Sequence, residues 1–310
     1  MSPSSDTESS AAPTAGSSMP PQPTILTPSL LREWRLPSPG GSKYGRGQVL
    51  VIGGARQTPG AVMLAGLSAL RVGAGRLTMA VAQSVAVPLA VAVPESGVVG
   101  LPETAEGSVL GEAAGDRLSA SVERADAVLV GSGLDDPDET AALLRTLLPL
   151  LGEDTAVVLD AFALGVLIDI DEVAQVCGGR LVLTPNEAEA ARLLDGSTGP
   201  IEDLPGAVIA IAARYQAVVS CHGWIADPAG TLWQVATGHS GLGTSGSGDV
   251  LAGGVVGLLA RGADPAQAAC WATHVHAAAG DRLSASIGPL GFLARELVDQ
   301  LPIVITELDT

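Results

Sequence analysis

An aspartate at the end of a glycine-rich segment is the residue of this sequence best placed to do chemistry. Asp249 closes a run of glycines and small hydroxyl residues that begins at Gly238, and such a run forms a loop because it cannot pack. The apolar residues 250–260 predict a buried helix that starts just after Asp249 and stops at Gly262. A glycine loop that opens a helix exposes free backbone N–H groups, and such sites bind anions, above all phosphate.

Two interpretations of Asp249 are open. An aspartate at this place often does no more than cap its helix. Beside Gly246, Ser247 and Gly248, however, it is also placed to face a bound phosphoryl group and to take a proton from a hydroxyl during phosphoryl transfer. Two other motifs do not fit, because a P-loop needs a lysine where Asp249 stands and an esterase elbow needs a glycine where Leu242 stands.

The elements that must position Asp249 are those of a parallel sheet. Short apolar runs predict buried parallel strands at residues 48–52, 76–81, 126–130, 156–159 and 181–183. A helix expected at residues 59–71 joins the first two strands in a parallel crossover unit. A Rossmann dinucleotide site is not expected, because the Gly-x-Gly-x-x-Gly spacing is absent and residues 70–81 contain no carboxylate for the ribose.

The second half of the chain adds strands and helices. Strands are expected at residues 217–220, 224–226 and 231–235, the last two forming a hairpin at the sheet edge. Helices are expected at residues 188–194, 265–282 and 291–300. His274 and His276 lie two apart in the second of these helices, so we expect a packed helix and no metal site.

Polar and glycine residues follow three of the predicted strands. Gly131, Ser132 and Gly133 follow one strand, Asp160 follows the next, and Asn186 comes shortly after a third. Each alone would be read as a turn glycine, a helix cap or a solvated residue. Because the carboxyl ends of parallel strands border one crevice, where ligands bind in such sheets, we expect these residues to face it together.

The charge of the chain limits its partners. The formal net charge is −17 and Lys43 is the only lysine, which excludes the basic surface that nucleic-acid binding needs. An anionic nucleotide would have to be held by helix amino ends, backbone amides, a few arginines and a metal ion.

Composition also predicts the domain organisation and the compartment. Residues 1–27 are rich in Ser, Pro, Thr and Ala, so we expect a disordered tail without a secretory signal, followed by one domain over residues 28–310. The longest apolar run, residues 85–99, is interrupted by prolines and a glutamate, and no membrane association is expected. A cytoplasmic protein is expected, with reduced thiols at Cys177, Cys221 and Cys270.

Several motifs resemble those of one enzyme family. Residues 242–249 (Leu-Gly-Thr-Ser-Gly-Ser-Gly-Asp) resemble the anion-hole motif of ribokinase-like enzymes, and in particular that of the NAD(P)H-hydrate dehydratases. Residues 43–54 resemble the opening signature of this family, and residues 130–134 resemble its Gly-Pro-Gly-Leu turn. The resemblance covers residues 30–304. It implies an α/β protein with the three-layer α/β/α ribokinase-like fold, a central, mostly parallel sheet and a glycine-rich anion hole.

The resemblance also implies an activity. Members of the family restore hydrated NADH or NADPH (NADHX or NADPHX) by phosphorylating the hydroxyl on the nicotinamide ring and eliminating phosphate. Bacterial members use ADP and eukaryotic ones ATP, with Mg²⁺ bridging the nucleotide phosphates. Asp249 would activate the hydroxyl, while the amides of Gly246, Ser247 and Gly248 stabilise the transferring group. A homotetramer is implied by resemblance as well.

The remaining site residues come from the same resemblance. Those expected to bind the hydrated cofactor are Ala61, Gly133, Asn186 and Asp249. Those expected to bind the nucleotide are Cys221, His222, Gly223, Gly246, Ser247 and Gly248. The chain departs from the family pattern at three places: Phe162 replaces a second aspartate, Asn186 replaces a histidine, and a lysine is missing near Cys221.

These departures leave two alternatives. One is a kinase of the same fold that acts on a vitamin alcohol or a sugar, and the other is a non-catalytic nucleotide-binding relative. A stable phosphorylated product would identify the kinase, whereas released phosphate would identify the dehydratase. The sequence does not decide between ADP and ATP, or between NADHX and NADPHX.

Overall fold

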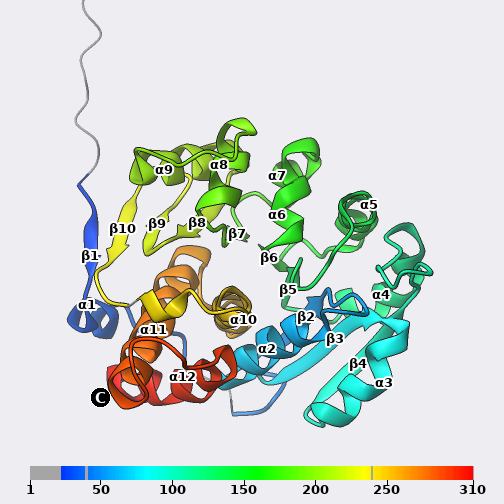
Figure 1. Ribbon diagram of the computed structural model, residues 1–310, viewed down its shortest axis with the longest axis horizontal. Coiled ribbons are helices and arrows are strands. Elements are labelled where there is room, and N and C mark those ends of the chain that lie inside the picture. Colours follow the sequence, from blue (N-terminus) through cyan, green and yellow to red (C-terminus); the bar gives the residue numbers. More distant parts are fainter. Residues whose placement is uncertain (1–21, 39–40, 239, 310) are drawn as a thin grey trace, which may run out of the picture.

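The protein is built on one mostly parallel sheet. The computed structural model describes residues 22–38, 41–238 and 240–309, and within them ten strands lie in the order β1-β10-β9-β8-β7-β6-β5-β2-β3-β4 (Figure 1). The strands are β1 (Thr24–Leu26), β2 (Gln48–Ile52), β3 (Arg76–Ala82), β4 (Ser96–Leu101), β5 (Ala127–Val130), β6 (Ala156–Leu159), β7 (Leu181–Leu183), β8 (Val218–Cys221), β9 (Trp224–Ala226) and β10 (Leu232–Val235). Strand β9 runs antiparallel to both neighbours, and every other pairing is parallel.

Helices cover both faces of this sheet, which explains why its central strands are apolar along their whole length. On one face a core cluster joins the sheet to α1 (Pro28–Glu33), α2 (Pro59–Arg71), α3 (Gln83–Ala92), α10 (Ser247–Ala260), α11 (Pro265–Ser286) and α12 (Ala294–Asp309). On the other face a second cluster joins it to α4 (Gly115–Val122), α5 (Pro137–Leu147), α6 (Phe162–Val166), α7 (Glu172–Cys177), α8 (Glu187–Asp195) and α9 (Leu204–Tyr215). The two helical layers lie below and above the sheet in Figure 1. The predicted three-layer α/β/α fold is therefore confirmed.

Helix α10, whose amino end carries Asp249, is held by close packing against α2. Most of its side chains are buried. Glycines make the contact possible: a Cβ on Gly253 would lie 2.1 Å from the backbone oxygen of Ala65, and one on Gly257 would lie 2.7 Å from the Cα of Ala69. The small residues thus let two backbones approach and fix where α10 begins.

The structure corrects two of the sequence expectations and adds elements where none was expected. The tail was expected to be disordered through Thr27, but Thr24–Leu26 forms β1, which pairs with β10; residues 1–21 lie outside the described residues. The β9–β10 hairpin forms as expected, yet β1 and not the hairpin occupies that edge of the sheet. The apolar run at residues 85–99, to which we assigned no element, contains most of α3 and the first part of the other edge strand, β4.

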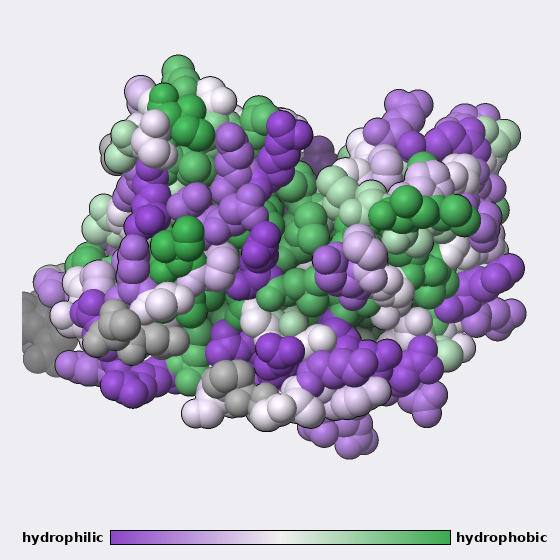
Figure 2. Space-filling view, turned by 90° about the horizontal axis from the view of Figure 1, so that it is seen from below, coloured by the Kyte–Doolittle hydropathy of each residue, from purple (hydrophilic) through white to green (hydrophobic). Residues whose placement is uncertain are grey.

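The remaining predicted strands and helices are confirmed to within a few residues at their ends, except α12, which runs nine residues past its expected end. No helix in the described part of the chain is long and apolar enough to cross a membrane. The face in Figure 2 is hollowed between two raised parts, and apolar side chains lie in the hollow as well as among the hydrophilic side chains of the raised parts.

A pair of alanine substitutions tests the role of the glycines in α10. Gly253→Ala should lower the free energy of unfolding by about 1–3 kcal/mol, because its methyl group would overlap the backbone of Ala65. Gly254→Ala is the matched control: its methyl group would make ordinary contacts, 3.6 Å from the Ala272 Cβ. That control should leave stability unchanged or raise it by up to about 1 kcal/mol. Urea denaturation measures both, and equal effects would contradict the packing described.

Candidate active site

The amino end of α10 provides free backbone donors. Gly246 caps the helix in the left-handed conformation, with φ of 88°, and the amide of Ser247 is already bonded to the Thr244 carbonyl at 3.1 Å. The amides of Gly248 and Asp249 belong to the first turn, where no helical carbonyl is available to them. They carry the positive end of the helix dipole, which attracts an anion.

Gly248 faces open space. A Cβ built on this residue would meet no atom within 4 Å, and its backbone φ is not in the left-handed region. Folding therefore does not require glycine here. A glycine that the fold does not need, at the exposed start of a helix, is suited to the close approach of a ligand to the backbone.

Asp249 lies inside the helix and not before it, which corrects the sequence expectation. It is the third residue of α10, in the first turn, and its carboxyl group is half-buried. Burial raises the pKa of this carboxyl, and a hydrogen bond with Ser132 opposes the increase. A carboxylate with a raised pKa next to free amides has the position and the basicity that a general base requires.

The turn after β5 approaches Asp249 from the centre of the sheet. Gly131 and Gly133 both have positive φ, and a Cβ on Gly131 would overlap the Asp160 carbonyl. A Cβ on Gly133 would lie 3.1 Å from that of Ala61, the third residue of α2. The two residues expected to line the hydrate pocket, Ala61 and Gly133, are thus brought together.

A second carboxyl group, Asp160, adjoins Asp249. It follows β6 and is buried, and it accepts hydrogen bonds from the hydroxyls of Thr184 at 2.9 Å and Ser132 at 3.5 Å. Burial, and then the charge of Asp249, raise the pKa of Asp160 to about 7. The Ser132 hydroxyl therefore interacts with both carboxyl groups, and the charge of Asp249 disfavours the ionisation of Asp160.

Asn186 occupies the carboxyl end of β7, as expected, but as a helix cap. Its Oδ1 accepts the Glu189 amide at 2.9 Å while the Glu189 carboxylate accepts the Asn186 amide, so the two residues form a capping box at the start of α8. The residue is exposed. Its side-chain nitrogen, which takes no part in the capping box, is the group left for a ligand.

The expected nucleotide segment, Cys221, His222 and Gly223, ends β8 and turns into β9. His222 and Gly223 have φ of 47° and 81°, the pattern of a two-residue hairpin turn. Burial raises the pKa of the Cys221 thiol to about 12, so this side chain is inert. A contact with a ligand would come from the turn backbone and from the exposed His222 ring.

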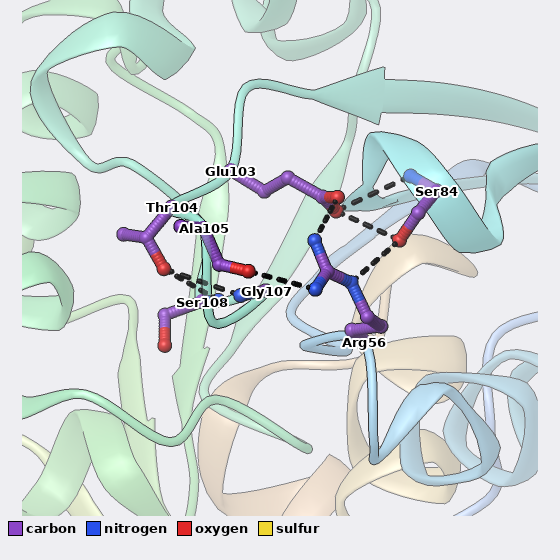
Figure 3. Close-up of polar contacts among 7 residues, drawn as sticks. All are labelled: Arg56, Ser84, Glu103, Thr104, Ala105, Gly107 and Ser108. Atoms are coloured by element: carbon purple, nitrogen blue, oxygen red, sulfur yellow. Dashed lines mark hydrogen bonds and ion pairs between the residues drawn. The ribbon is translucent and has the colours of Figure 1, made fainter.

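One arginine that the sequence analysis did not single out joins the loops on the β2–β4 side of the sheet. Arg56, in the loop after β2, donates to the Glu103 carboxylate at 2.7 Å, the Ala105 carbonyl at 2.9 Å and the Ser84 hydroxyl at 3.3 Å. Figure 3 shows its guanidinium between these three groups. The same loop bonds to the Gly133 carbonyl through the Ala55 amide and the Thr58 hydroxyl, each at 2.7 Å.

His276, expected only as part of a packed helix, contacts the predicted anion site. Its Nε2 lies 3.0 Å from the Ser247 hydroxyl, and both side chains are buried. The sequence signal for this contact is weak, because twenty-nine residues separate the two positions. Asp160 was recognised as a strand-end carboxylate, but its pairing with Asp249 was not.

Fold and site together define a class of protein. A mostly parallel sheet between two helical layers is the arrangement of the ribokinase-like fold. The crystal structure of a ribokinase-like superfamily protein from Enterococcus faecalis has this fold, with a TM-score of 0.77 at 24% identity over 92% of this chain and 96% of that one.

The family follows from the sequence comparison. A family model described as NAD(P)H-hydrate dehydratase matches residues 49–303, so the chain belongs to the NAD(P)H-hydrate dehydratase family. The chain is 42% identical to the ADP-dependent (S)-NAD(P)H-hydrate dehydratase of Xanthomonas campestris pv. campestris, over 93% of this chain and 98% of that one.

Two further similar proteins are a longer one found by sequence and one whose crystal structure has the same fold. The bifunctional NAD(P)H-hydrate repair enzyme Nnr of Moorella thermoacetica is 37% identical over 85% of this chain, which spans only 50% of that protein. The crystal structure of the Bacillus subtilis ADP/ATP-dependent NAD(P)H-hydrate dehydratase, co-crystallized with ATP/Mg²⁺, has a TM-score of 0.74 at 25% identity and covers 92% of this chain and 98% of its own.

The raised pKa of Asp160 predicts a pH dependence of stability. In the folded protein Asp160 keeps a proton between about pH 4 and pH 7 that the unfolded chain has lost, so its contribution to the free energy of unfolding falls as the pH rises through this window. Asp160→Asn removes the ionisation. The stability of the variant relative to the natural protein should therefore increase from pH 4 to pH 7, by on the order of 3 kcal/mol, and then level off.

Urea denaturation at several pH values measures this difference. Thr184→Val is the control, because it removes a hydrogen bond to Asp160 without removing the carboxyl group. A difference between Asp160→Asn and the natural protein that stays constant from pH 4 to pH 8 would contradict the assignment.

Proposed function

We propose that this protein restores hydrated reduced nicotinamide cofactors, NADHX and NADPHX, to NADH and NADPH with a phosphoryl group from ADP. The observation that carries the proposal is the placement of Asp249 beside the free amides of the α10 start, in a chain 42% identical to an ADP-dependent enzyme of this name. Family membership supports the same reaction.

The chemistry proceeds in two stages. In the first, the ring hydroxyl of the hydrated cofactor attacks the terminal phosphoryl group of the nucleotide; an O–P bond forms, the bond to the leaving phosphate oxygen breaks, and Asp249 takes the hydroxyl proton. In the second, the electron pair of the ring nitrogen expels phosphate, and the neighbouring ring carbon loses a proton to restore the double bond. Phosphate is a far better leaving group than hydroxide. The nucleotide therefore contributes the phosphoryl group that makes the elimination possible.

The residues around Asp249 have separate parts in this proposal. The amides of Gly248 and Asp249 hold the transferring group, and open space over Gly248 accommodates it. Ala61 and Gly133 line the side where the hydrated ring would bind, and Asn186 would offer its side-chain nitrogen. The turn at His222 and Gly223 would contact the nucleotide through its backbone.

A magnesium ion fits the residues present. Asp160 is an oxygen donor of the kind that Mg²⁺ prefers, and a cation near it would stabilise its ionised form, which burial disfavours. No group of three or more His, Cys, Asp or Glu in the described residues could hold an ion alone. Asp160 would therefore hold the ion only together with a bound nucleotide, and the ion would supply positive charge to neutralise phosphate.

The proposal extends to assembly and location. We infer a homotetramer that works in the cytoplasm, where the reduced cofactors and ADP are found. Sedimentation of the purified protein tests the first part.

The decisive experiment supplies hydrated NADH or NADPH with Mg²⁺ and either ADP or ATP, and follows both the absorbance of the reduced cofactor and released phosphate. We expect both signals to rise together. Asp249→Asn should reduce kcat by about 10²- to 10⁴-fold, the usual contribution of a general base, while nucleotide affinity measured by calorimetry changes little. Asp116→Asn, which neutralises an exposed aspartate in the first turn of α4, is the matched control.

Each alternative has its own signature in this assay. A stable phosphorylated product without released phosphate would identify a kinase. Nucleotide binding without any turnover would identify a non-catalytic relative. Full activity of Asp249→Asn would remove Asp249 from its assigned role.

The open space over Gly248 gives a further prediction. Gly248→Ala adds a methyl group where the phosphoryl group is proposed to lie, so kcat/KM for the nucleotide should fall at least about tenfold, the cost of a poorly placed group. Thermal stability should stay the same or rise slightly, because alanine favours the helix. Gly254→Ala, the same change on the same helix, should keep full activity. Unchanged kinetics in Gly248→Ala would place the phosphoryl group elsewhere.

A further inference from the structure

Helix α11 contacts both ends of the glycine-rich segment that precedes α10. At one end, Nε2 of His276 lies 3.0 Å from the Ser247 hydroxyl. At the other end, the Asp281 carboxylate accepts the Gly238 amide at 3.1 Å and the Thr237 hydroxyl. The two anchoring residues are five positions apart on one helix, so a single rigid element fixes where the segment begins and where it ends.

The segment also packs on α11 between these anchors. A Cβ on Gly280 would lie 2.7 Å from Cδ2 of Leu242, and a Cβ on Gly238 would lie 3.2 Å from that of Ala277. Glycine-rich chain has no conformational preference of its own and pays a large entropy cost when it is ordered. The positions of Gly238 and Leu242 are therefore set by the helix on which they lie.

His276 makes its contact as a neutral group. Burial lowers the pKa of His276 to about 4, against the effect of a hydrogen bond with the Ser247 backbone. The neutral ring has one donor and one acceptor nitrogen, and Ser247, itself buried, is the partner of Nε2. Removing the His276 ring would take away the buried partner of the Ser247 hydroxyl.

We propose that His276 is a positioning residue, which holds Ser247 so that the Gly248 amide and the Asp249 carboxylate are aligned for phosphoryl transfer. This inference rests on the proposed function. His276 acts through Ser247, the first residue of α10, and Ser247 is followed directly by the two residues that would contact the transferring group. A small rotation of this turn changes the direction of both.

A second histidine on the same helix offers a matched control. His274 is as deeply buried as His276, but its Nδ1 has no hydrogen-bond partner among the residues that the structure describes, and it lies two residues away on a different helical face. His274→Leu and His276→Leu are therefore the same chemical change in the same helix. Only the second removes a contact with the anion site.

Steady-state kinetics of these variants test the proposal. His276→Leu should lower kcat per folded molecule about 10²-fold, the effect of a misaligned donor, with KM for the hydrated cofactor within about twofold. His276→Gln, whose amide reaches the position of Nε2, should recover most of kcat. His274→Leu should keep kcat per folded molecule, with the folded fraction of each variant measured by circular dichroism. Equal losses in both leucine variants, or no recovery in His276→Gln, would overturn the proposal.

A double-mutant cycle with Ser247→Ala gives an independent result. If His276 acts through Ser247, the losses of kcat in the two single variants should not multiply in the double variant. Multiplicative losses would overturn the inference.

Amide hydrogen exchange separates this inference from the proposed function. His276→Leu should speed exchange at residues 246–249 at least about tenfold, since local opening costs less without the anchor, and His274→Leu should not. This readout requires no turnover. If the protein showed no activity toward hydrated cofactors, the proposed function would be refuted. The positioning role of His276 would then be decided by the exchange rates at residues 246–249.

Discussion

The central constraint on the proposed reaction is that a strongly acidic protein must hold an anion. The formal net charge is −17, and the half-buried Asp249 lies close enough to the buried Asp160 for its charge to raise the pKa of Asp160, so bulk charge does not attract phosphate. Attraction has to come from groups whose charge cannot be titrated away, and the amides at the start of α10 are such groups. Their strength depends on direction, so the surrounding structure is arranged to keep the first turn of one helix in place.

Three kinds of packing serve that end. Glycines in α10 allow contact with the backbone of α2, which sets the height of the helix over the sheet. The turn at residues 131–133 packs closely against the end of β6 on one side and the loop after β2 on the other. This turn carries Ser132, whose hydroxyl interacts with the two carboxyl groups. Helix α11 fixes the segment that leads into α10. Arg56 steadies the loops on the β2–β4 side, so that both sides of the site are held by structure distant in sequence.

Much of this was accessible from the sequence, because local signals are strong where a strand ends in glycine or a glycine loop opens a helix. The strands, the crossover order and the role of Asp249 as a candidate base follow from such signals. The pairing of Asp160 with Asp249, the contact of His276 with Ser247 and the bonds of Arg56 join residues 28 to 89 positions apart, and no local pattern encodes them. Strand β1 was missed for a related reason: three residues in a polar tail become a strand only because β10 presents an unpaired edge.

That last pairing has a consequence for handling the protein. The main-chain groups of β10 on the side away from the hairpin are satisfied by Thr24–Leu26, and the stacked rings of Trp34 and Trp233, 6.1 Å apart, lie in the same region. A shortened chain that starts at Pro28, the domain boundary that composition alone suggests, would leave β10 as an unpaired edge strand. Such an edge can pair with a strand of a second molecule. Self-association in such a preparation would then reflect the trimming and not the native assembly.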